Sequence, residues 1–410
     1  MDARLSWMMI LGVPLLLCAG CSESAPDEVT DLTPKPRPTL AGESASFLEG
    51  SAAAREALRA VPDRLLLDAK YGPTQKKEII AALSGPEAKL ERSLRGPWAR
   101  AYQASAVDQV SDEVKGWNWL SRSLDWQSQE ALEQQNWPLA AAKSLTAIRF
   151  GLRLTTGDCF EAVGGLTTAE IHASRLAPQV SQMGPKTLTA VSLGIQDALK
   201  GMADPEVTLS NEMDRISTTL QSLQTACRSD GYKGMLPIIG PTSHDGAAWI
   251  RSNKKKLGWF FRAFRDECAD LSTEYVAASS GKEFDEDIFK PRSKRWEGVT
   301  RPWRDMTPQI MAGHEAYRKA RLGVTARLRL LAVTCAVEAK LKQEGKVPRN
   351  LDFLPASLRK DPYGEGDLAY RPGEVTYRLW SVGPNGVDDG GLTDPGTVIL
   401  DMGLRTPLAE

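Results

Sequence analysis

The feature that most constrains the fold is a helical spacing of apolar residues, which runs with little strand-like alternation from residue 47 to about residue 317. Leu257, Phe261, Phe264, Cys268 and Leu271, for example, recur at intervals of four, three, four and three, which places them on one face of a helix. Similar apolar stripes recur along the region, separated by short turn-like segments. The pattern predicts a mainly α protein whose helices form an antiparallel array.

Several helix starts can be located from capping residues. Asn136 and Asp204 each stand shortly before a proline and an apolar stripe, which is typical of a helix N-terminus. Thr167 with Glu170 three residues later has the spacing of a capping box, so we expect a third helix to begin there.

The N-terminus has the pattern of an export signal. Arg4 is followed by a mostly apolar run over residues 5–18, and the small residues Ala19 and Gly20 precede Cys21. The run of roughly 14 residues is short for a membrane-spanning helix, which needs about 20. We therefore predict that residues 1–20 are a signal peptide.

Residues 16–21, Leu-Leu-Cys-Ala-Gly-Cys, resemble a bacterial lipoprotein signal, in which the cysteine after Ala-Gly is lipidated. The resemblance implies a lipid on Cys21, a membrane partner through that anchor, and a place in the cell envelope. Ser22 after the cysteine favours the outer membrane, facing the periplasm or the outside. Cys18 stands where that family usually has Leu, so cleavage without lipidation is the alternative. Residues 21–46 are proline-rich and polar and are expected to form the anchor and a disordered linker.

Composition narrows the function classes. The chain has 51 Lys and Arg against 52 Asp and Glu, and this balance gives no electrostatic basis for binding nucleic acid. The three histidines, His172, His244 and His314, form no metal-binding spacing such as H-E-x-x-H. No cysteine pair has C-x-x-C spacing, which argues against zinc and thioredoxin-like chemistry.

Four cysteines follow the anchor: Cys159, Cys227, Cys268 and Cys335. An even number in an oxidising compartment is compatible with two disulfides, for which three pairings exist. Because Cys227 and Cys268 lie on apolar helix stripes, the alternative is that the cysteines are small buried hydrophobic residues. The sequence leaves both interpretations open.

The best catalytic candidate in the sequence is the segment Thr-Ser-His-Asp-Gly at residues 242–246, which contains His244 and Asp245. Members of a nucleophile triad normally converge from different segments, and neighbouring glycine and proline residues mark a turn here. A polar loop is therefore the preferred interpretation, and no catalytic residue is assigned.

The pattern changes over residues 319–410. An apolar helix stripe ends near Gly345, an Asp361-Pro362 turn follows, and short strands are expected over residues 368–371, 375–382 and 398–400. Residues 319–410 are thus predicted to be a small α+β module, made of a helix and a short antiparallel sheet, after a helical domain over residues 47–318.

This module resembles the C-terminal part of the major pseudopilins of type II secretion over about 90 residues. The matching positions are Gly345, Pro348, Leu351, Asp361, Pro362, Tyr363, Gly364, Tyr370, Arg371, Ser381, Val382, Gly383, Gly386, Asp388 and Asp389. The chain lacks the hydrophobic N-terminal helix of a pseudopilin, and the helix leading into the module carries several Lys and Arg residues. We therefore interpret the module as an appended fold and not as a filament subunit.

The resemblance implies a calcium site in the acidic loop. The ligands carried over from the family are the carbonyls of Leu379 and Ser381 with Asn385, Asp388 and Asp389. Oxygen ligands of this kind suit calcium, although Asn385 replaces the usual Asp. No other cofactor is expected.

The sequence favours a non-enzymatic envelope lipoprotein that acts as a scaffold or binding protein, with an envelope protein as its candidate partner. A helical hydrolase-type enzyme is one alternative. An accessory component of a secretion or pilus system is another.

Overall fold

The computed structural model describes residues 43–62, 65, 69–100, 102, 111–230, 244–280, 301–391 and 402–403. The export signal, Cys21 and nearly all of the expected linker lie outside these residues. The helices of the first half are α1 (Ala45–Ala60), α2 (Pro73–Ser93), α3 (Asp112–Glu133), α4 (Trp137–Arg153), η1 (Leu154–Thr156), α5 (Cys159–Leu176), η2 (Ala177–Gln182), α6 (Pro185–Lys200) and α7 (Pro205–Asp230). Those of the second half are α9 (His244–Ser252), η4 (Lys254–Lys256), α10 (Leu257–Ser279), α11 (Thr307–Ile310), α12 (Ala312–Glu344) and α13 (Ala356–Arg359).

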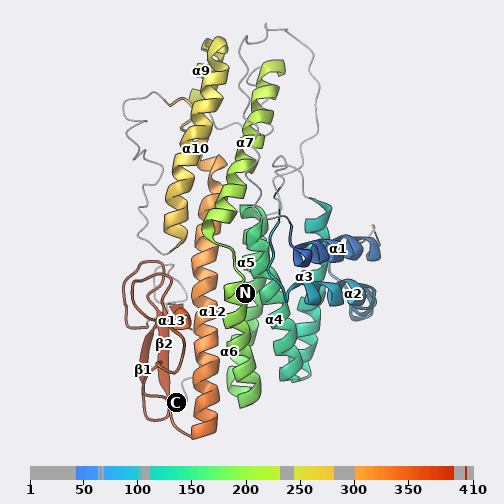
Figure 1. Ribbon diagram of the computed structural model, residues 1–410, viewed down its shortest axis with the longest axis vertical. Helices are drawn as coiled ribbons and strands as arrows, with labels where there is room; N and C mark the ends of the chain where they lie inside the picture. Colours follow the sequence, from blue (N-terminus) through green and yellow to red (C-terminus); the bar gives the residue numbers. More distant parts are fainter. Residues whose placement is uncertain are drawn as a thin grey trace.

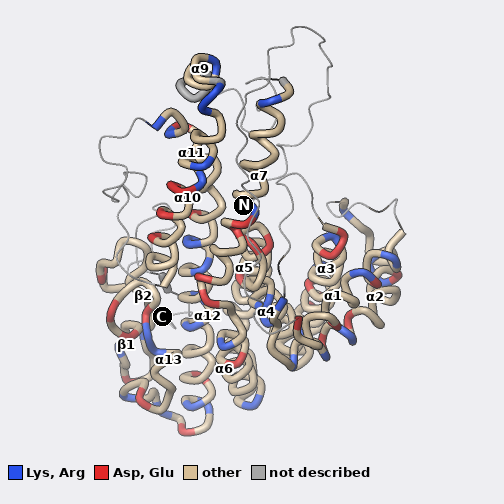
Figure 2. The backbone as a smooth tube through the Cα atoms, turned by 45° about the horizontal axis from the view of Figure 1, so that its top comes forward, with Lys and Arg blue, Asp and Glu red and all other residues tan. Residues whose placement is uncertain are grey.

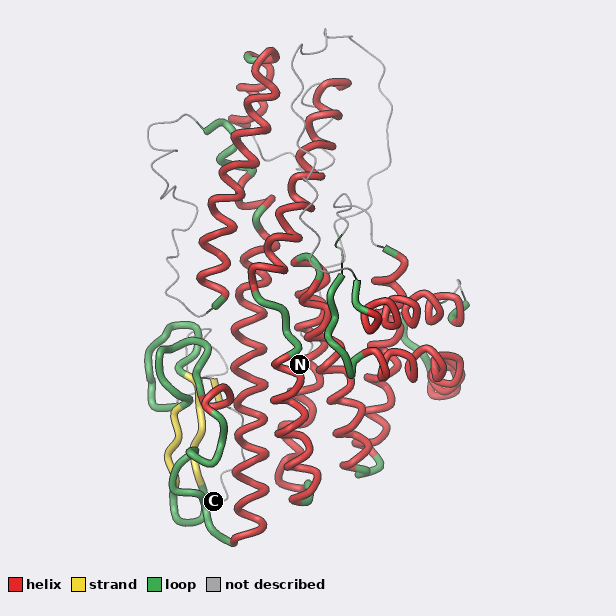
Figure 3. The backbone as a smooth tube through the Cα atoms, viewed as in Figure 1, coloured by secondary structure: helices red, strands yellow, loops and turns green. Residues whose placement is uncertain are grey.

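The described chain is mainly α with a small C-terminal α+β module, as predicted (Figures 1 and 3). Helices α4, α5, α6 and α12 pack lengthwise against one another, while α7 and α10 pack as a pair that extends beyond them. Helices α1 to α3 lie to one side of this array. Basic and acidic residues are interspersed over the molecule as a whole, although α12 carries a run of basic residues from Arg318 to Arg329 (Figure 2).

Helix α12 organises the larger of two hydrophobic clusters. Its 33 residues contact α5, α6 and α10 of the helical body and also α13 and β2 of the C-terminal module. The helix crosses the domain boundary expected at residue 318, and Leu351, Leu358 and Tyr377 of the C-terminal module share its core. The module therefore packs onto the helical body through one continuous helix.

The smaller cluster lies between α1, α2 and α3 and is rich in tryptophan. Trp98, Trp117 and Phe150 pack in a chain of ring contacts, with ring centroids 6.2 and 6.3 Å apart for the two pairs that include Trp98. Phe150 belongs to α4, so this cluster is attached to the main array through that helix. The rings supply much of the apolar surface that three helices alone would lack.

The observed starts of α4, α5 and α7 can be compared with those predicted from capping residues. Asn136 caps α4, where its side chain accepts a hydrogen bond from the Leu139 N–H at 3.3 Å, and α7 begins directly after Asp204. The start expected at Thr167 is wrong, because α5 begins at Cys159. Its cap is Asp158, which accepts from the Glu161 N–H at 3.0 Å. A stronger cap nine residues earlier, at Asp158, thus makes Thr167 an interior residue.

Close packing explains one of the two glycines inside α5, Gly165, but not Gly164. A Cβ atom on Gly165 would lie 2.2 Å from the carbonyl oxygen of Gly151 on α4, whereas one on Gly164 would meet nothing within 4 Å. The backbones of α4 and α5 can approach each other because neither residue has a side chain there.

The sheet of the module is antiparallel, in the order β1 (Ala369–Pro372), β2 (Tyr377–Ser381) and β3 (Met402–Gly403). Tyr370 pairs with Leu379 in the register of β1 and β2. The first two expected strands are confirmed, and the strand expected at residues 398–400 lies outside the described residues. Helix α12 ends as predicted at Gly345, whose φ of 71° is the left-handed conformation that glycine favours at a helix C-terminus.

Candidate metal centre

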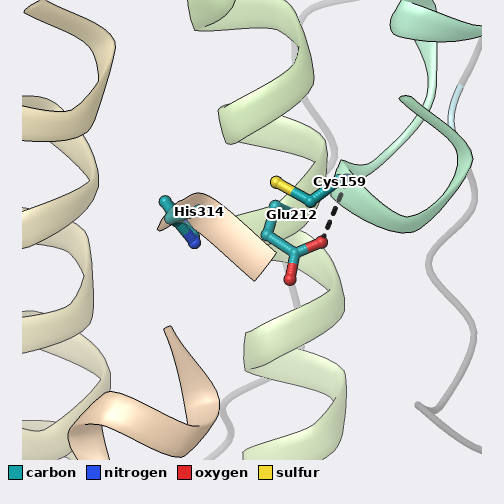
Figure 4. Close-up of side chains that lie close together, drawn as sticks. All are labelled: Cys159, Glu212 and His314. Atoms are coloured by element: carbon teal, nitrogen blue, oxygen red, sulfur yellow. Dashed lines mark hydrogen bonds between the residues drawn. The ribbon is translucent and has the colours of Figure 1, made fainter. Parts of the chain in front are cut away.

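Three metal-ligand side chains from three helices converge where α5, α7 and α12 meet. Cys159 is the first residue of α5, Glu212 lies in the second turn of α7, and His314 lies in the first turn of α12 (Figure 4). Each offers one donor atom, and these atoms lie within 4.8 Å of one another. Within the part of the chain that the structure describes, this is the one group of three or more His, Cys, Asp and Glu side chains with such convergence.

The centre is enclosed by protein. Cys159 is 1% exposed, and Glu212 and His314 are each 0% exposed. Zinc ligands lie about 2.0–2.3 Å from the metal, so tetrahedral donors are about 3.3–3.8 Å apart. The observed spacing therefore requires an inward shift of roughly one ångström to close around an ion.

Hydrogen bonds hold the carboxylate in place. The Cys159 N–H donates to Glu212 Oε2 at 3.2 Å, and Arg215 Nε donates to the same oxygen at 2.9 Å. Arg215 Nη2 also contacts Glu212 Oε1. Gly313 permits this approach, because a Cβ there would lie 2.9 Å from Glu212 Oε1 and 3.2 Å from Cys159 Cβ.

His314 is a neutral imidazole, and one of its two ring nitrogens is available to bind a metal ion. Nε2 lies 3.1 Å from Ser272 Oγ, whereas Nδ1 is buried and has no hydrogen-bond partner. Burial, with a smaller contribution from Arg215, lowers the pKa of His314 to about 3. The tautomer that donates Nε2–H to Ser272 leaves a lone pair on Nδ1, and this arrangement is the usual one for a metal-binding histidine.

The surrounding charges leave an excess of negative charge. Three carboxyl groups, those of Asp158, Glu161 and Glu212, are paired with two guanidinium groups. Arg100 pairs with Glu161 and Arg215 with Glu212. Burial raises the pKa of Glu161 to about 7; Arg100 opposes this rise and Asp158 adds to it. A bound cation would offset the excess.

The thiol is protonated while the centre holds no cation. Burial raises the pKa of Cys159 well above its usual value, and the charges of Glu212 and Asp158 raise it further. A metal ion would have to displace this proton, since the thiolate is the form that binds metal. Thiolate, imidazole and carboxylate together suit Zn²⁺ and neighbouring divalent transition metals better than calcium.

The four cysteines do not form the two disulfides that the sequence left open. All four cysteines are free and buried, in α5, α7, α10 and α12. All four belong to the larger hydrophobic cluster, as expected for small buried residues, and Cys159 also faces Glu212 and His314.

The predicted calcium ligands lie in β2 and the loop after it. Asn385 Nδ2 donates to Asp389 at 2.8 Å, and Asp388 Oδ1 accepts from Trp380 Nε1 at 2.9 Å. Ser381 Oγ donates to Asp361 at 2.7 Å. Leu379 pairs with β1. The loop thus brings Asn385 and Asp389 together, and local donors already engage Asp388.

Residues 242–243 of the catalytic candidate lie outside the described residues, but His244 begins helix α9, so the polar loop expected here is wrong for residues 244–246. A different Ser-His-Asp group, missed from the sequence, lies between α3, α4 and α5. His172 Nδ1 lies 3.4 Å from Ser144 Oγ, and His172 Nε2 lies 3.8 Å from Asp125. Ser144 is 0% exposed and also bonds to Ser128 at 2.8 Å. A nucleophile needs access to its substrate, so this group is a buried polar contact between helices.

None of the helices in the described residues is long and apolar enough to cross a membrane. No known protein-family model matches the sequence, and no curated protein and no solved structure shows significant similarity to the chain. The geometry of the centre is therefore the observation from which a function can be inferred.

Proposed function

We propose that this chain is an exported, lipid-anchored envelope protein whose helical body binds a divalent transition-metal ion without catalysing a reaction. The observation that supports this proposal most directly is the convergence of Cys159, Glu212 and His314, with the buried Nδ1 of His314 lacking a hydrogen-bond partner. A buried polar nitrogen without a partner is costly, and a metal ion would satisfy it.

The donor set favours zinc. Zinc accepts thiolate, imidazole and carboxylate ligands in one tetrahedral site and has no redox chemistry. Calcium and magnesium prefer oxygen ligands alone. This proposal departs from the expectation drawn from cysteine spacing, because the three ligands come from separate helices.

The burial of the site favours binding over catalysis. Catalytic zinc keeps a position open to substrate, whereas every protein ligand here is at most 1% exposed. A metal at this position would cross-link α5, α7 and α12 and add its binding free energy to the stability of the fold.

Metal content and cobalt spectroscopy test the proposal. The metal-free protein, dialysed against Zn²⁺ and washed, should retain about one equivalent, and Co²⁺ should produce a thiolate-to-cobalt charge-transfer band. Cys159→Ser and His314→Gln should lose the band and most of the zinc. Cys227→Ser and His172→Gln are matched controls, buried residues of the same type away from the centre, and should retain both. Zinc content near zero in the wild type would show that the cluster is a structural polar network.

Lipid attachment at Cys21 is tested separately from metal binding. Radiolabelled palmitate should be incorporated into the wild type and not into Cys21→Ser, which should be released in soluble form. Equal labelling of the two proteins would contradict the lipid anchor and leave the metal proposal untouched.

A further inference from the structure

Arg215 is paired with the carboxylate of Glu212, which a metal ion at the centre would need as a ligand. It lies one turn after Glu212 on α7, and it contacts both carboxylate oxygens through Nε and Nη2. Burial alone would lower the pKa of Arg215, but the charge of Glu212 outweighs burial and raises it, so the guanidinium stays charged. A guanidinium and a divalent cation on one buried carboxylate repel each other strongly, because the surroundings screen charge poorly.

A second carboxylate is available to Arg215 nearby. Asp158 Oδ2 lies 3.8 Å from Arg215 Nε and accepts a hydrogen bond from the Tyr102 hydroxyl at 2.6 Å. In the described part of the chain, Arg215 is the one cationic side chain paired with Asp158 within 4 Å. Asp158 is therefore the carboxylate with the weakest compensation while Arg215 is held by Glu212.

We propose that Arg215 is an internal counter-ion that is exchanged for the metal, moving from Glu212 to Asp158 when the ion binds. The inference rests on the proposed metal binding at Cys159, Glu212 and His314. In the exchange the Cys159 thiol releases its proton to solvent, a metal–sulfur bond forms, and Glu212 coordinates the ion. Because Arg215 Nε already lies 3.8 Å from Asp158 Oδ2, a change of side-chain rotamer brings the guanidinium to that carboxylate.

The charge balance supports the exchange. With the metal bound, the divalent ion is neutralised by the Cys159 thiolate and Glu212, and Arg215 is neutralised by Asp158. Arg100 remains paired with Glu161 as before. Each buried charge then has a partner of its own, whereas in the metal-free arrangement Asp158 shares Arg215 with Glu212 and lies 3.8 Å from Arg215 Nε.

Zinc affinity, measured by competition with a chromophoric chelator, tests the exchange. Arg215→Gln keeps a hydrogen-bond donor but removes the charge, and it should bind Zn²⁺ at least tenfold more tightly than the wild type. Arg215→Lys keeps the charge and should bind within about threefold of the wild type. Asp158→Asn keeps a helix-capping oxygen but removes the alternative partner of Arg215, and it should bind at least tenfold more weakly. In the Arg215→Gln background, Asp158→Asn should change the affinity less than threefold.

The outcomes separate this inference from the proposed function. If the wild type binds zinc and Arg215→Gln binds it equally or more weakly, Arg215 orients Glu212 and the exchange is overturned. Should Arg215→Gln fail to fold, Asp158→Asn alone decides, because it leaves the Arg215–Glu212 pair intact; an unchanged affinity would overturn the exchange. Absence of zinc binding in the wild type would overturn the proposed function itself.

Discussion

The junction of α5, α7 and α12 buries its donor atoms, whereas the loop over residues 385–391 leaves Asp388 exposed and Asp389 half-buried. At the junction every polar group needs a partner inside the protein, since water is excluded. In the loop, water can solvate a carboxylate that binds nothing. A buried cluster with an unpartnered nitrogen is therefore stronger evidence for a ligand than an acidic loop, even where the loop resembles a known calcium site.

The largest expected effect comes from breaking the buried ion pair. Glu212→Gln keeps the shape of the side chain but removes the closer of the two carboxylates beside Arg215, and it should lower the free energy of unfolding by at least about 3 kcal/mol. Glu344→Gln breaks the exposed pair with Lys340 on α12 and should cost less than about 0.5 kcal/mol. Urea unfolding measures both, and similar small losses would show that the junction is not a buried electrostatic site.

His172 is a buried histidine outside the candidate metal centre, and the pH dependence of the free energy of unfolding tests its burial. Burial lowers its pKa from 6.5 to about 4, with Asp125 and Arg175 beside it. Between these values the unfolded chain binds a proton that the folded protein does not, so stability is complete above pH 6.5 and declines as the pH falls toward 4. The wild type should lose about 3 kcal/mol more than His172→Gln between pH 7 and pH 4. Identical pH dependence of the two proteins would contradict this.

Two glycines of α12 distinguish crowding at the junction from an open helix surface. Gly313→Ala places a methyl group against Glu212 and Cys159, so it should cost about 1 kcal/mol and weaken zinc binding. Gly323→Ala meets only the Tyr363 hydroxyl at 3.5 Å and should stabilise the helix by about 0.5 kcal/mol. Thermal unfolding compares the variants. Equal melting temperatures of the two variants would mean that the junction is loosely packed.

The smallest expected effect belongs to the acidic loop. If the loop is a calcium site, millimolar Ca²⁺ should raise the melting temperature of the full chain by about one degree relative to a chelator. The Asp388→Ala, Asp389→Ala double variant should abolish that difference, whereas Cys159→Ser should retain it. No response to calcium in the wild type would leave the loop as an acidic turn.

The features that depend on local physics could be predicted from the amino-acid sequence. Apolar spacing predicted the helices, Asn136 and Gly345 marked where two of them begin and end, and the strands around Tyr370 and Leu379 followed from their composition. These signals lie within a few residues of what they specify, so they can be recognised without knowing the fold.

Only the tertiary structure decided the candidate centre. Cys159 and Glu212 are 53 residues apart, and His314 lies on a third helix. No spacing rule connects them, because their approach depends on how α5, α7 and α12 pack. The start of α5 was predicted wrongly for a related reason. Asp158 caps the helix in place of Thr167, and the close approach of Gly151 and Gly165 depends on how α4 and α5 pack. Local patterns specify elements, and side-chain packing between distant elements brings the donor atoms together.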